Sequence, residues 1–277
     1  VGTGGDQQNT VNISTMAALV IAGTGATVVK HGNRASTSKS GSADVLEALG
    51  IQLDMPIKSV AACARQVGIT FLFAMTFHPS MRFVGPTRKM LGIPTAFNYL
   101  GPMTNPARVS SSAIGVANPQ MVEKMAWVFA NRGDHALVFR GDDGLDELTI
   151  ATTSQIWEAS GGTLQKYIFN PEGYGIERSS LDNLRGGDAE YNASVFRAVL
   201  AGEGESAKDS LHAIRNAVLI NAAAGLIAYR KNDGRSFEER YTEALADARQ
   251  SIDTGAAAQV LNAWVEFSHL VVETPSP

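Results

Sequence analysis

The sequence predicts an α/β fold in which a central, mostly parallel sheet is flanked by helices. Three observations favour it. Short β-branched or apolar runs of strand length alternate with helical stretches through the first half of the chain. Two loops rich in small polar residues, 2–14 and 30–42, each lead into a helix. An acidic turn at 141–149 follows a predicted strand, at the position where open α/β sheets bind ligands.

The composition is that of a soluble globular protein. Its 277 residues include 23 Lys and Arg against 27 Asp and Glu, a net charge of −4, so we expect no nucleic acid as partner. Cys63 is the only cysteine, which excludes a disulfide framework. No apolar run reaches membrane length and no signal sequence is visible, so we expect a cytoplasmic protein without membrane contact. Without repeats or linkers, residues 1–277 are expected to form a single α/β domain.

The first half of the chain is expected to build most of the sheet. An apolar helix should follow the loop at 2–14, and the next helix, at 43–49, should have Ser42 as its N-cap and Gly50 as its end. The remaining elements are expected as strands at 27–29, 69–74, 112–116 and 136–139, and as helices at 15–22, 56–67, 81–91 and 119–131.

Prolines should interrupt this half of the chain at two places. Gly85 and Pro86 are expected to divide the helix at 81–91 into separate turns. The two prolines of the segment 101–107 should exclude regular structure there. The second half is predicted as a hairpin that turns at 161–162, followed by helices at 188–200, 207–229, 237–251 and 256–270.

The loop at 30–42 has the composition of an anion site. It combines Lys30, Arg34 and Lys39 with hydroxyls and glycines, directly before a helix N-terminus. Backbone N–H groups and fixed cations at such a position bind phosphate well. A basic loop of this kind can also be an ordinary solvated surface loop. The glycine-rich loop at 2–6, one helix and one strand earlier, strengthens the phosphate interpretation.

The acidic turn has the composition of a magnesium site. Asp142, Asp143, Asp146 and Glu147 stand close together after a predicted strand, and carboxylates this close repel one another unless a cation neutralises them. Oxygen ligands suit Mg²⁺, which often bridges carboxylates to substrate phosphates. The alternative is an acidic, solvated turn, because Asp-Asp-Gly is common turn chemistry.

With two phosphate loops and a carboxylate cluster in place, the sequence resembles the anthranilate phosphoribosyltransferase family through nearly its whole length. The resemblance rests on the order and combined length of six motifs. These are GTGGD at 2–6, TVNIST at 10–15, KHGNR at 30–34, SGSADVLEALG at 40–50, GPMTNPA at 101–107 and GDDGLDELT at 141–149.

The resemblance implies a nucleoside phosphorylase-like fold and the second step of tryptophan biosynthesis from chorismate. The phosphoribosyl group of 5-phosphoribosyl-1-diphosphate passes to the amine of anthranilate, and diphosphate leaves. It assigns the donor to Gly2, Gly5, Asp6, Thr10, Asn12, Ile13, Ser14, Thr15, Lys30, His31, Gly32, Asn33, Arg34, Ala35, Ser36, Thr37, Ser38 and Ser42. It assigns the acceptor to Gly2, Asn33, Arg88 and His78, and Mg²⁺ to Ser14, Asp146 and Glu147.

The resemblance also sets the expected catalysis and assembly. Lys30, Arg34 and Mg²⁺ should stabilise the departing diphosphate, whereas the aromatic amine needs no strong general base. His31 is a weaker candidate for acid–base work. Family members are expected to form a homodimer through a helical segment upstream of Val1, which this chain is expected to lack.

Three rival functions stay open at this stage. A pyrimidine nucleoside phosphorylase would share the architecture and a glycine-rich loop, but it would use free phosphate and would have no comparable need for Asp146 and Glu147. A module that only binds phosphate would keep the loops without turnover. A related phosphoribosyltransferase could use another acidic aromatic acceptor, because Arg88 implies an acid without fixing which one.

Overall fold

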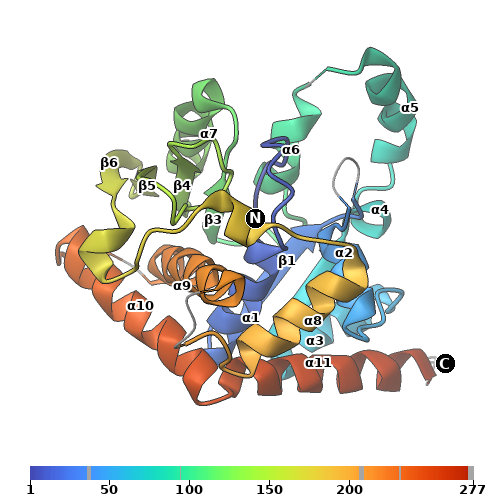
Figure 1. Ribbon diagram of the computed structural model, residues 1–277. Coiled ribbons are helices and arrows are strands. Elements are labelled where there is room, and N and C mark those ends of the chain that lie inside the picture. The colour runs from blue at the N-terminus through green and yellow to red at the C-terminus, as the bar shows by residue number, and fades with distance from the viewer. Residues whose placement is uncertain (36–38, 94, 206–208, 231, 274–277) are drawn as a thin grey trace.

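The computed structural model describes residues 1–35, 39–93, 95–205, 209–230 and 232–273, and it confirms the α/β class (Figure 1). The strands fall into two separate sheets, where one central sheet was expected. In the smaller sheet, β1 (Val28–Gly32) pairs in parallel with β2 (Ile69–Phe73). The larger sheet has the strand order β3-β4-β5-β6 and is made by Ser111–Gly115, His135–Gly141, Ser154–Ser160 and Thr163–Phe169.

The larger sheet is mixed. β3 and β4 are parallel, whereas β4, β5 and β6 run antiparallel. The antiparallel end results from the predicted hairpin, in which Gly161 and Gly162 both have positive φ and so turn the chain tightly between β5 and β6. The hairpin prediction is therefore confirmed.

Helices surround both sheets. In chain order they are α1 (Ile13–Gly23), α2 (Ser42–Ala48), α3 (Ile57–Gln66), α4 (Ala74–Phe77), α5 (Met81–Leu91), α6 (Phe97–Met103), α7 (Pro119–Arg132), α8 (Ala189–Leu200), α9 (Ser210–Tyr229), α10 (Phe237–Asp253) and α11 (Ala256–Glu273). Two short 3₁₀ helices, η1 (Pro171–Tyr174) and η2 (Leu181–Leu184), precede α8. Each helix expected from the sequence is present, within a few residues of its expected ends.

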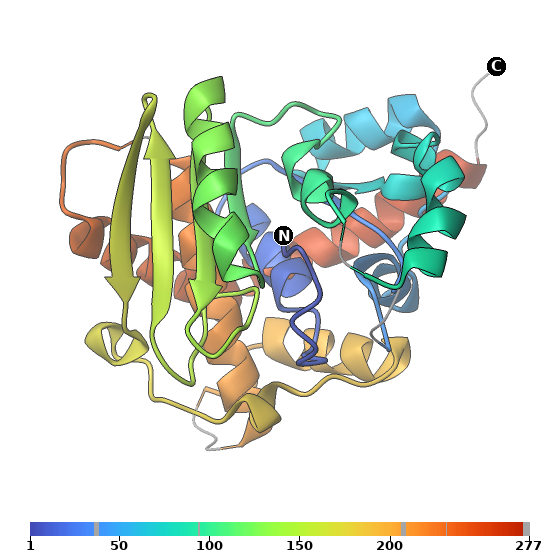
Figure 2. The same ribbon diagram turned by 90° about the horizontal axis from the view of Figure 1, so that it is seen from above.

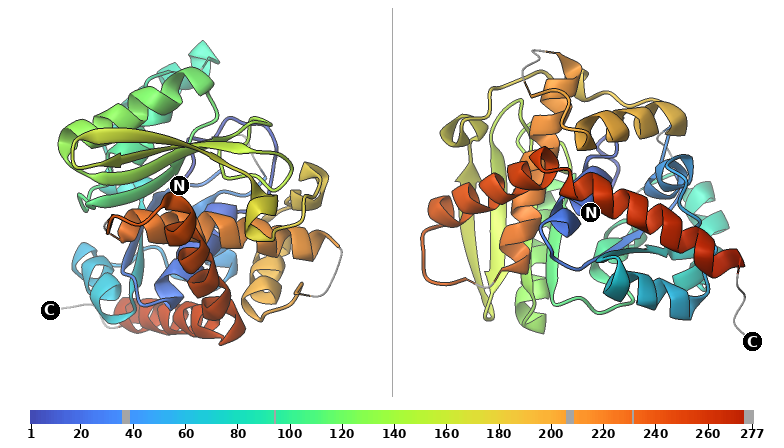
Figure 3. Two further views of the ribbon diagram at one scale, coloured as in Figure 1. Left: turned by 90° about the vertical axis from the view of Figure 1, so that its left-hand side faces the viewer. Right: turned by 90° about the horizontal axis from the view of Figure 1, so that it is seen from below.

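The core lies around α9. This helix is long and apolar enough to cross a membrane by composition, but 83% of that apolar window is buried inside the fold, as in the core helix of a soluble protein. α7 covers one face of the larger sheet and α9 packs against the other (Figure 2). α1 packs against α9, and α11 extends across α1 at the base of the molecule, as the view from below shows (Figure 3).

Two expectations about prolines are wrong. Pro86 lies inside a continuous α5, and Pro102 lies inside α6. Proline removes one backbone N–H and costs about 3 kcal/mol in a helix interior, but it excludes helix only where nothing compensates. Here Pro86 is exposed, so water can bind the carbonyl that loses its partner. Pro102 is the last residue but one of a seven-residue helix, where few bonds are lost.

The N-terminal loop lies between the two sheets (Figure 2). Gly2 forms a parallel bridge with Gly115 at the end of β3, and Thr3 N–H donates to the carbonyl of Gly115 over 3.0 Å. The end of β3 thus brings this loop beside the acidic turn that follows β4. The same arrangement places the start of α1 beside β1.

Candidate active site

The glycine-rich loop and the acidic turn meet at Asp146. Gly4 N–H donates to Asp146 Oδ2 over 2.6 Å, although the two residues are 142 positions apart in the sequence. A Cβ at Gly2 would lie 2.2 Å from the same oxygen, and a Cβ at Gly115 would lie 1.6 Å from the carbonyl of Asp146. Both positions therefore require glycine for reasons of space.

Asp146 and Glu147 are buried carboxylates, and among the described residues Lys30 and the Val1 ammonium are the cationic groups that act on them. Each is 8% exposed. Burial raises the pKa of Asp146 well above its ordinary value, and the charges of Glu147 and Asp6 raise it further. Burial raises the pKa of Glu147 to about 7, although the charges of the Val1 ammonium and of Lys30 oppose this shift. The repulsion expected for Asp146 and Glu147 from the sequence is thus present.

Lys30 supplies a buried positive charge at the same place. It is the central residue of β1 and, unlike its neighbours on the strand, it is buried, with 4% exposure. Burial lowers its pKa to about 8, against the attraction of Glu147. Its Nζ donates to Ser14 Oγ over 3.1 Å, and the backbone N–H of Ser14 interacts with Glu147. Lys30, Ser14 and Glu147 therefore form one cluster.

The residues present suit a magnesium ion that a substrate helps to hold. Within the part of the chain that the structure describes, no three His, Cys, Asp or Glu side chains are arranged to bind a metal by themselves. Mg²⁺ usually keeps several waters and binds one or two carboxylates together with substrate phosphates. The raised pKa values of Asp146 and Glu147 indicate that a cation would stabilise their ionised forms.

The four-carboxylate cluster expected from the sequence is divided in two. Asp142 turns to the hairpin, where it accepts hydrogen bonds from Thr153 Oγ1 over 2.5 Å and Gln155 Nε2 over 2.8 Å. Asp143 accepts from Thr149 Oγ1 over 2.5 Å and so closes its own turn. Asp142 and Asp143 therefore stabilise the turn, and only the second pair faces the glycine-rich loop.

Arg34 is engaged by carboxylates. Its guanidinium donates to both oxygens of Glu47, over 2.5 and 2.7 Å, and to Asp44 over 3.2 Å. These hydrogen bonds raise its pKa, those to Glu47 most. The electrostatic role expected for Arg34 would require the guanidinium to exchange these partners for a phosphate. Ser36, Thr37 and Ser38, also expected at the donor, lie outside the described residues.

Two histidines pack together near β1. The rings of His31 and His78 have centroids 4.8 Å apart, and His31 Nδ1 lies 3.2 Å from the carbonyl of Gly101. Burial, followed by the charge of His78, lowers the pKa of His31, so its neutral form is favoured. Within the described chain, Nε2 of each ring is buried without a hydrogen-bond partner. Arg88 lies on α5, but its side chain is outside the described part.

The other expected donor residues surround these clusters or support them. Asp6 adds charge beside Asp146 and Glu147, and Gly5 has a φ of +87° that suits only glycine well. Several others contribute packing or backbone geometry. Thr10 forms an antiparallel β-bridge with Arg185, Ile13 is buried in the core, and Gly32 packs against Phe71. Thr15 Oγ1 donates to Ser42 Oγ over 3.3 Å, and the Asn33 carbonyl accepts from Ala43 N–H over 3.2 Å.

Ser42 is the first residue of α2, and Gly41 is the N-cap, so the N-cap expectation is wrong by one position. The cap position must pass very close to the start of the loop, where only glycine fits. The hydroxyl oxygen of Ser42 accepts a hydrogen bond from Thr15 Oγ1 over 3.3 Å.

Sequence reasoning missed two polar residues that support the site. Asn192 of α8 is 1% exposed, and its Nδ2 donates to Asn12 Oδ1 over 2.9 Å. Asn12 Nδ2 in turn donates to the carbonyl of Ser40 over 3.1 Å. Asp44, the other missed residue, binds the basic loop. A polar residue on the apolar face of a helix was the available signal for Asn192.

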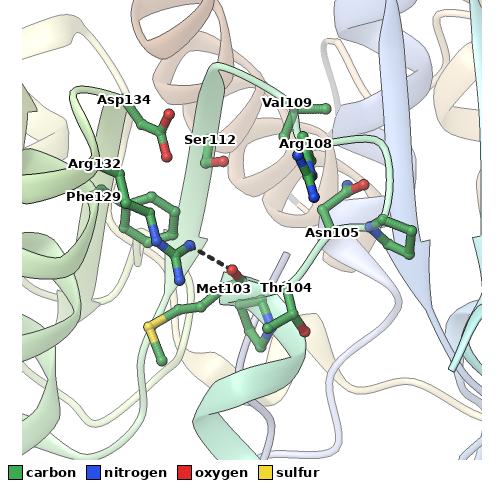
Figure 4. Close-up of a pocket in the computed structure, with 11 residues that line it drawn as sticks. Met103, Thr104, Asn105, Arg108, Val109, Ser112, Phe129, Arg132 and Asp134 are labelled. Carbon is green, nitrogen blue, oxygen red and sulfur yellow. Dashed lines mark hydrogen bonds between the residues drawn. The ribbon is translucent and has the colours of Figure 1, made fainter.

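A cavity of about 560 Å³ lies elsewhere, at the far end of β3 and β4 from the acidic turn. It is lined by the end of α6, the segment after it and the end of α7 (Figure 4). Arg132 crosses it and donates to the carbonyl of Met103 over 2.6 Å. None of the expected site residues lines it, so we do not assign it to the reaction.

Comparisons with known proteins agree with the geometry. The sequence model described as "Glycosyl transferase family, a/b domain" matches residues 1–258. The anthranilate phosphoribosyltransferase of Arthrobacter sp. (strain FB24) is 57% identical over 97% of this chain and 74% of its own length. The enzyme of the same name from Rhodococcus opacus (strain B4) is 54% identical over 97% of this chain and 72% of its own length.

Solved structures are similar as well. The crystal structure of anthranilate phosphoribosyltransferase from Thermus thermophilus matches with a TM-score of 0.86 and 40% identity, over 97% of this chain and 76% of that one. The Saccharomyces cerevisiae enzyme in complex with PRPP and Mg matches with a TM-score of 0.85 and 30% identity, over 97% of this chain and 72% of that one. A further structure of the yeast enzyme, with 4-fluoroanthranilate, has a TM-score of 0.83.

Proposed function

The chain belongs to the anthranilate phosphoribosyltransferase family, and we propose that Ser14, Lys30, Asp146 and Glu147 form its phosphoribosyl-donor site. The reaction transfers the phosphoribosyl group of 5-phosphoribosyl-1-diphosphate to the amine of anthranilate, and it releases diphosphate. It is the second step of tryptophan biosynthesis from chorismate. The yeast relative solved with PRPP and Mg supports a donor and a metal at this fold.

The observation that carries the site assignment is the buried charge around Lys30. Asp146, Glu147 and Lys30 are each at most 8% exposed, and Asp6 adds a further carboxylate nearby. Burying ions costs several kcal/mol each unless they are well paired. Among the described residues, Lys30 does not balance these carboxylates alone, and burial lowers the pKa of the nearby Val1 ammonium to about 5, so that group is mostly neutral at neutral pH. A divalent cation together with a polyanionic substrate would complete the charge balance.

Asp146 and Glu147 would hold Mg²⁺, with Ser14 beside them, and the ion would neutralise negative charge on the departing diphosphate. The chain's own residues then act by electrostatics and position. A pKa of about 8 keeps Lys30 mostly protonated at neutral pH, so it can stabilise negative charge that develops on the leaving group. The loop at 2–6 brings backbone N–H groups beside the same carboxylates.

No general base is assigned. The amine of anthranilate is neutral and has a free lone pair, so the reaction needs correct placement more than proton removal. The lowered pKa of His31 also favours a neutral ring that can bind a polar aromatic ligand. The two buried Nε2 atoms of His31 and His78, without partners in the described chain, support an acceptor position next to β1. Gly2, Asn33 and Arg88 complete the proposed acceptor site.

The proposed activity is tested by following the loss of anthranilate fluorescence. Turnover should require both 5-phosphoribosyl-1-diphosphate and Mg²⁺, and one phosphoribosyl-anthranilate should form per diphosphate released. A matched assay with a pyrimidine nucleoside and free phosphate should give no product. Turnover in that second assay alone would overturn the proposal, and donor binding without turnover would indicate a binding module.

The acceptor assignment predicts a selective effect of Arg88→Ala. Loss of a guanidinium that meets the anthranilate carboxylate should raise the anthranilate KM about 10-fold to 100-fold. The KM of the phosphoribosyl donor should change less than about threefold. Initial rates measured with each substrate varied in turn give both values. Equal increases in the two KM values would count against Arg88 as an acceptor ligand.

We also propose a homodimer for the full-length form, a single catalytic domain over 1–277 and a cytoplasmic location. Exposed apolar side chains on α4 and α5 support a further packing partner, because such side chains are normally covered. Met75, Phe83 and Met90 are 65%, 71% and 81% exposed. Sedimentation velocity at several concentrations tests the dimer. A monomer of the full-length form at all concentrations would exclude it.

A further inference from the structure

Asp44 holds two distant points of the basic loop together. It lies in the first turn of α2, and one of its oxygens, Oδ2, accepts from Ala35 N–H over 2.9 Å and from Gly41 N–H over 2.8 Å. Its other oxygen accepts from Arg34 over 3.2 Å. A helix-capping carboxylate needs only bonds to its own first turn. The bond to Ala35 reaches nine positions back, outside the helix.

The lack of space for a side chain at Gly41 shows how closely the segment 33–35 approaches the start of α2. A Cβ at Gly41 would lie 2.3 Å from the nitrogen of Ala35 and 2.8 Å from the carbonyl oxygen of Asn33. Its φ is −90°, so glycine is required by the neighbouring chain and not by a left-handed backbone. The N–H of Ala43 also donates to Asn33 over 3.2 Å. The segment 33–35 is therefore pressed against the start of α2.

We propose that Asp44 is a positioning residue for the donor: it fixes the backbone at Asn33–Ala35 against Gly41 and Ser42, so that this part of the loop is ready for the donor phosphates. The inference rests on the proposed donor site and names a residue beyond those assigned to it. Asp44 itself does not touch the donor, because its oxygens face the protein's own N–H groups and Arg34.

The charge of Asp44 fits this role. Burial alone would raise the pKa of Asp44, but hydrogen bonds from Ala35, Gly41 and Arg34 outweigh burial and lower it. The carboxylate is therefore ionised at neutral pH, and its charge is matched by the donors around it. Because residues 33–35 are already held in place, donor binding does not lose affinity to the entropy cost of ordering them.

Glu47 provides a matched control on the same helix, one turn further on. It binds Arg34 through two hydrogen bonds, of 2.5 and 2.7 Å, but no backbone N–H of the loop is bonded to it within the described chain. Its side chain is 41% exposed. Glu47→Gln therefore weakens the ion pair with Arg34 and leaves the backbone contacts of Asp44 in place. The pair of variants separates loop positioning from simple charge pairing.

The test compares Asp44→Ala, Asp44→Asn and Glu47→Gln with the full wild-type chain, by initial rates with donor and acceptor varied in turn and by thermal unfolding. We expect Asp44→Ala to raise the donor KM at least about 10-fold and the anthranilate KM less than about threefold. Asp44→Asn should fall between, because its amide oxygen can still accept from both N–H groups, but the negative charge is lost and an NH₂ group replaces the oxygen that accepts from Arg34. Glu47→Gln should change the donor KM less than about threefold.

Several results would overturn the inference. These are an unchanged donor KM in folded Asp44→Ala, equal increases in both KM values, and an effect of Glu47→Gln as large as that of Asp44→Ala. If Asp44→Ala does not fold, the donor KM of Asp44→Asn decides in the same way. A wild-type chain without Mg²⁺-dependent anthranilate turnover would instead overturn the proposed function, so the two failures are distinguishable.

Discussion

Two buried groups of carboxylates in this molecule have opposite electrostatic environments. Glu158 of β5 is 2% exposed, and Arg240 of α10 donates to both of its oxygens over 2.8 Å. Although burial opposes it, the hydrogen bonds from Arg240 and from His135 lower the pKa of Glu158 to about 2. Asp146 and Glu147 are nearly as buried, but their pKa values are raised.

The difference separates a structural site from the proposed functional one. Around Glu158, hydrogen-bond donors from two elements satisfy the carboxylate, and Arg240 ties α10 to the sheet, so no ligand is needed. Around Asp146 and Glu147, like charges lie close together beside Lys30. Their ionised forms therefore destabilise the fold when no ligand is bound. Carboxylates with strongly raised pKa values often mark functional sites for this reason. The following predictions test whether the two groups differ in function as they do in charge.

The largest expected effect is on catalysis. The double change Asp146→Asn with Glu147→Gln should lower Mg²⁺-dependent kcat/KM by about 1,000-fold or more, because it removes both carboxylates that are proposed to hold the metal. The same change should leave the urea midpoint unchanged or higher, because it also removes repulsion. Steady-state rates across a Mg²⁺ titration and urea unfolding measure the two quantities. If the double variant keeps wild-type activity across the Mg²⁺ titration, Asp146 and Glu147 do not hold the metal.

The next effect is on stability. Arg240→Ala leaves the Glu158 carboxylate buried without its bidentate partner, and it should lower the free energy of unfolding by about 3–5 kcal/mol. kcat and both KM values of the folded fraction should stay within about twofold, because α10 is remote from the donor site. Arg235→Ala is the control: its ion pairs with Asp233 and Glu243 are about half exposed, and it should lower the free energy of unfolding far less than Arg240→Ala does. A catalytic defect in Arg240→Ala at full stability would contradict the comparison.

The smallest effect is on the pH dependence of stability, where the two groups should have opposite signs. The folded pKa of Glu158, about 2, lies below the ordinary 4.5, so its stabilisation is present above pH 4.5 and is lost as the pH falls towards 2. The folded pKa of Glu147, about 7, lies above 4.5, so its carboxyl reduces stability as the pH rises from 4.5 to 7. We expect about 1–3 kcal/mol from each group.

Urea unfolding between pH 3 and 8, with EDTA present, checks these signs. Glu147→Gln should flatten the decline between pH 4.5 and 7, whereas Glu158→Gln should reduce the gain in stability between pH 3 and 4.5. Identical pH profiles for wild type and Glu147→Gln would show that this carboxyl is not destabilised by burial.

Much of the fold could be predicted from local sequence. The β-branched run before Lys30 and the apolar pattern of 207–229 predicted β1 and the core helix α9, because strand and helix periodicities are local properties. The predictions for Pro86 and Pro102 were wrong for a related reason. The sequence shows that each proline removes a backbone hydrogen bond of the helix, but it does not show that water or a nearby helix end compensates for that bond.

The residues of the proposed donor site could be named by type from the sequence, but their contacts could be predicted only in part. Lys30, Ser14 and Glu147 were all named from their motifs, and the structure brings them together. Arg34 was named as a catalytic cation, yet it is paired with Glu47 and Asp44 on the adjacent helix. An ion pair depends on which side chains the loop brings within reach, and motif spacing carries no such information.

By itself, the sequence determined the order of the elements, the family motifs and the residue types available for phosphate and metal. Only the tertiary structure decided which carboxylates are satisfied. It turned Asp142 to the hairpin, paired Glu158 with Arg240, and left Asp146 facing the N-terminal loop. The physical reason is that charge energetics depend on distance and burial between residues far apart in the chain, whereas sequence patterns report only near neighbours.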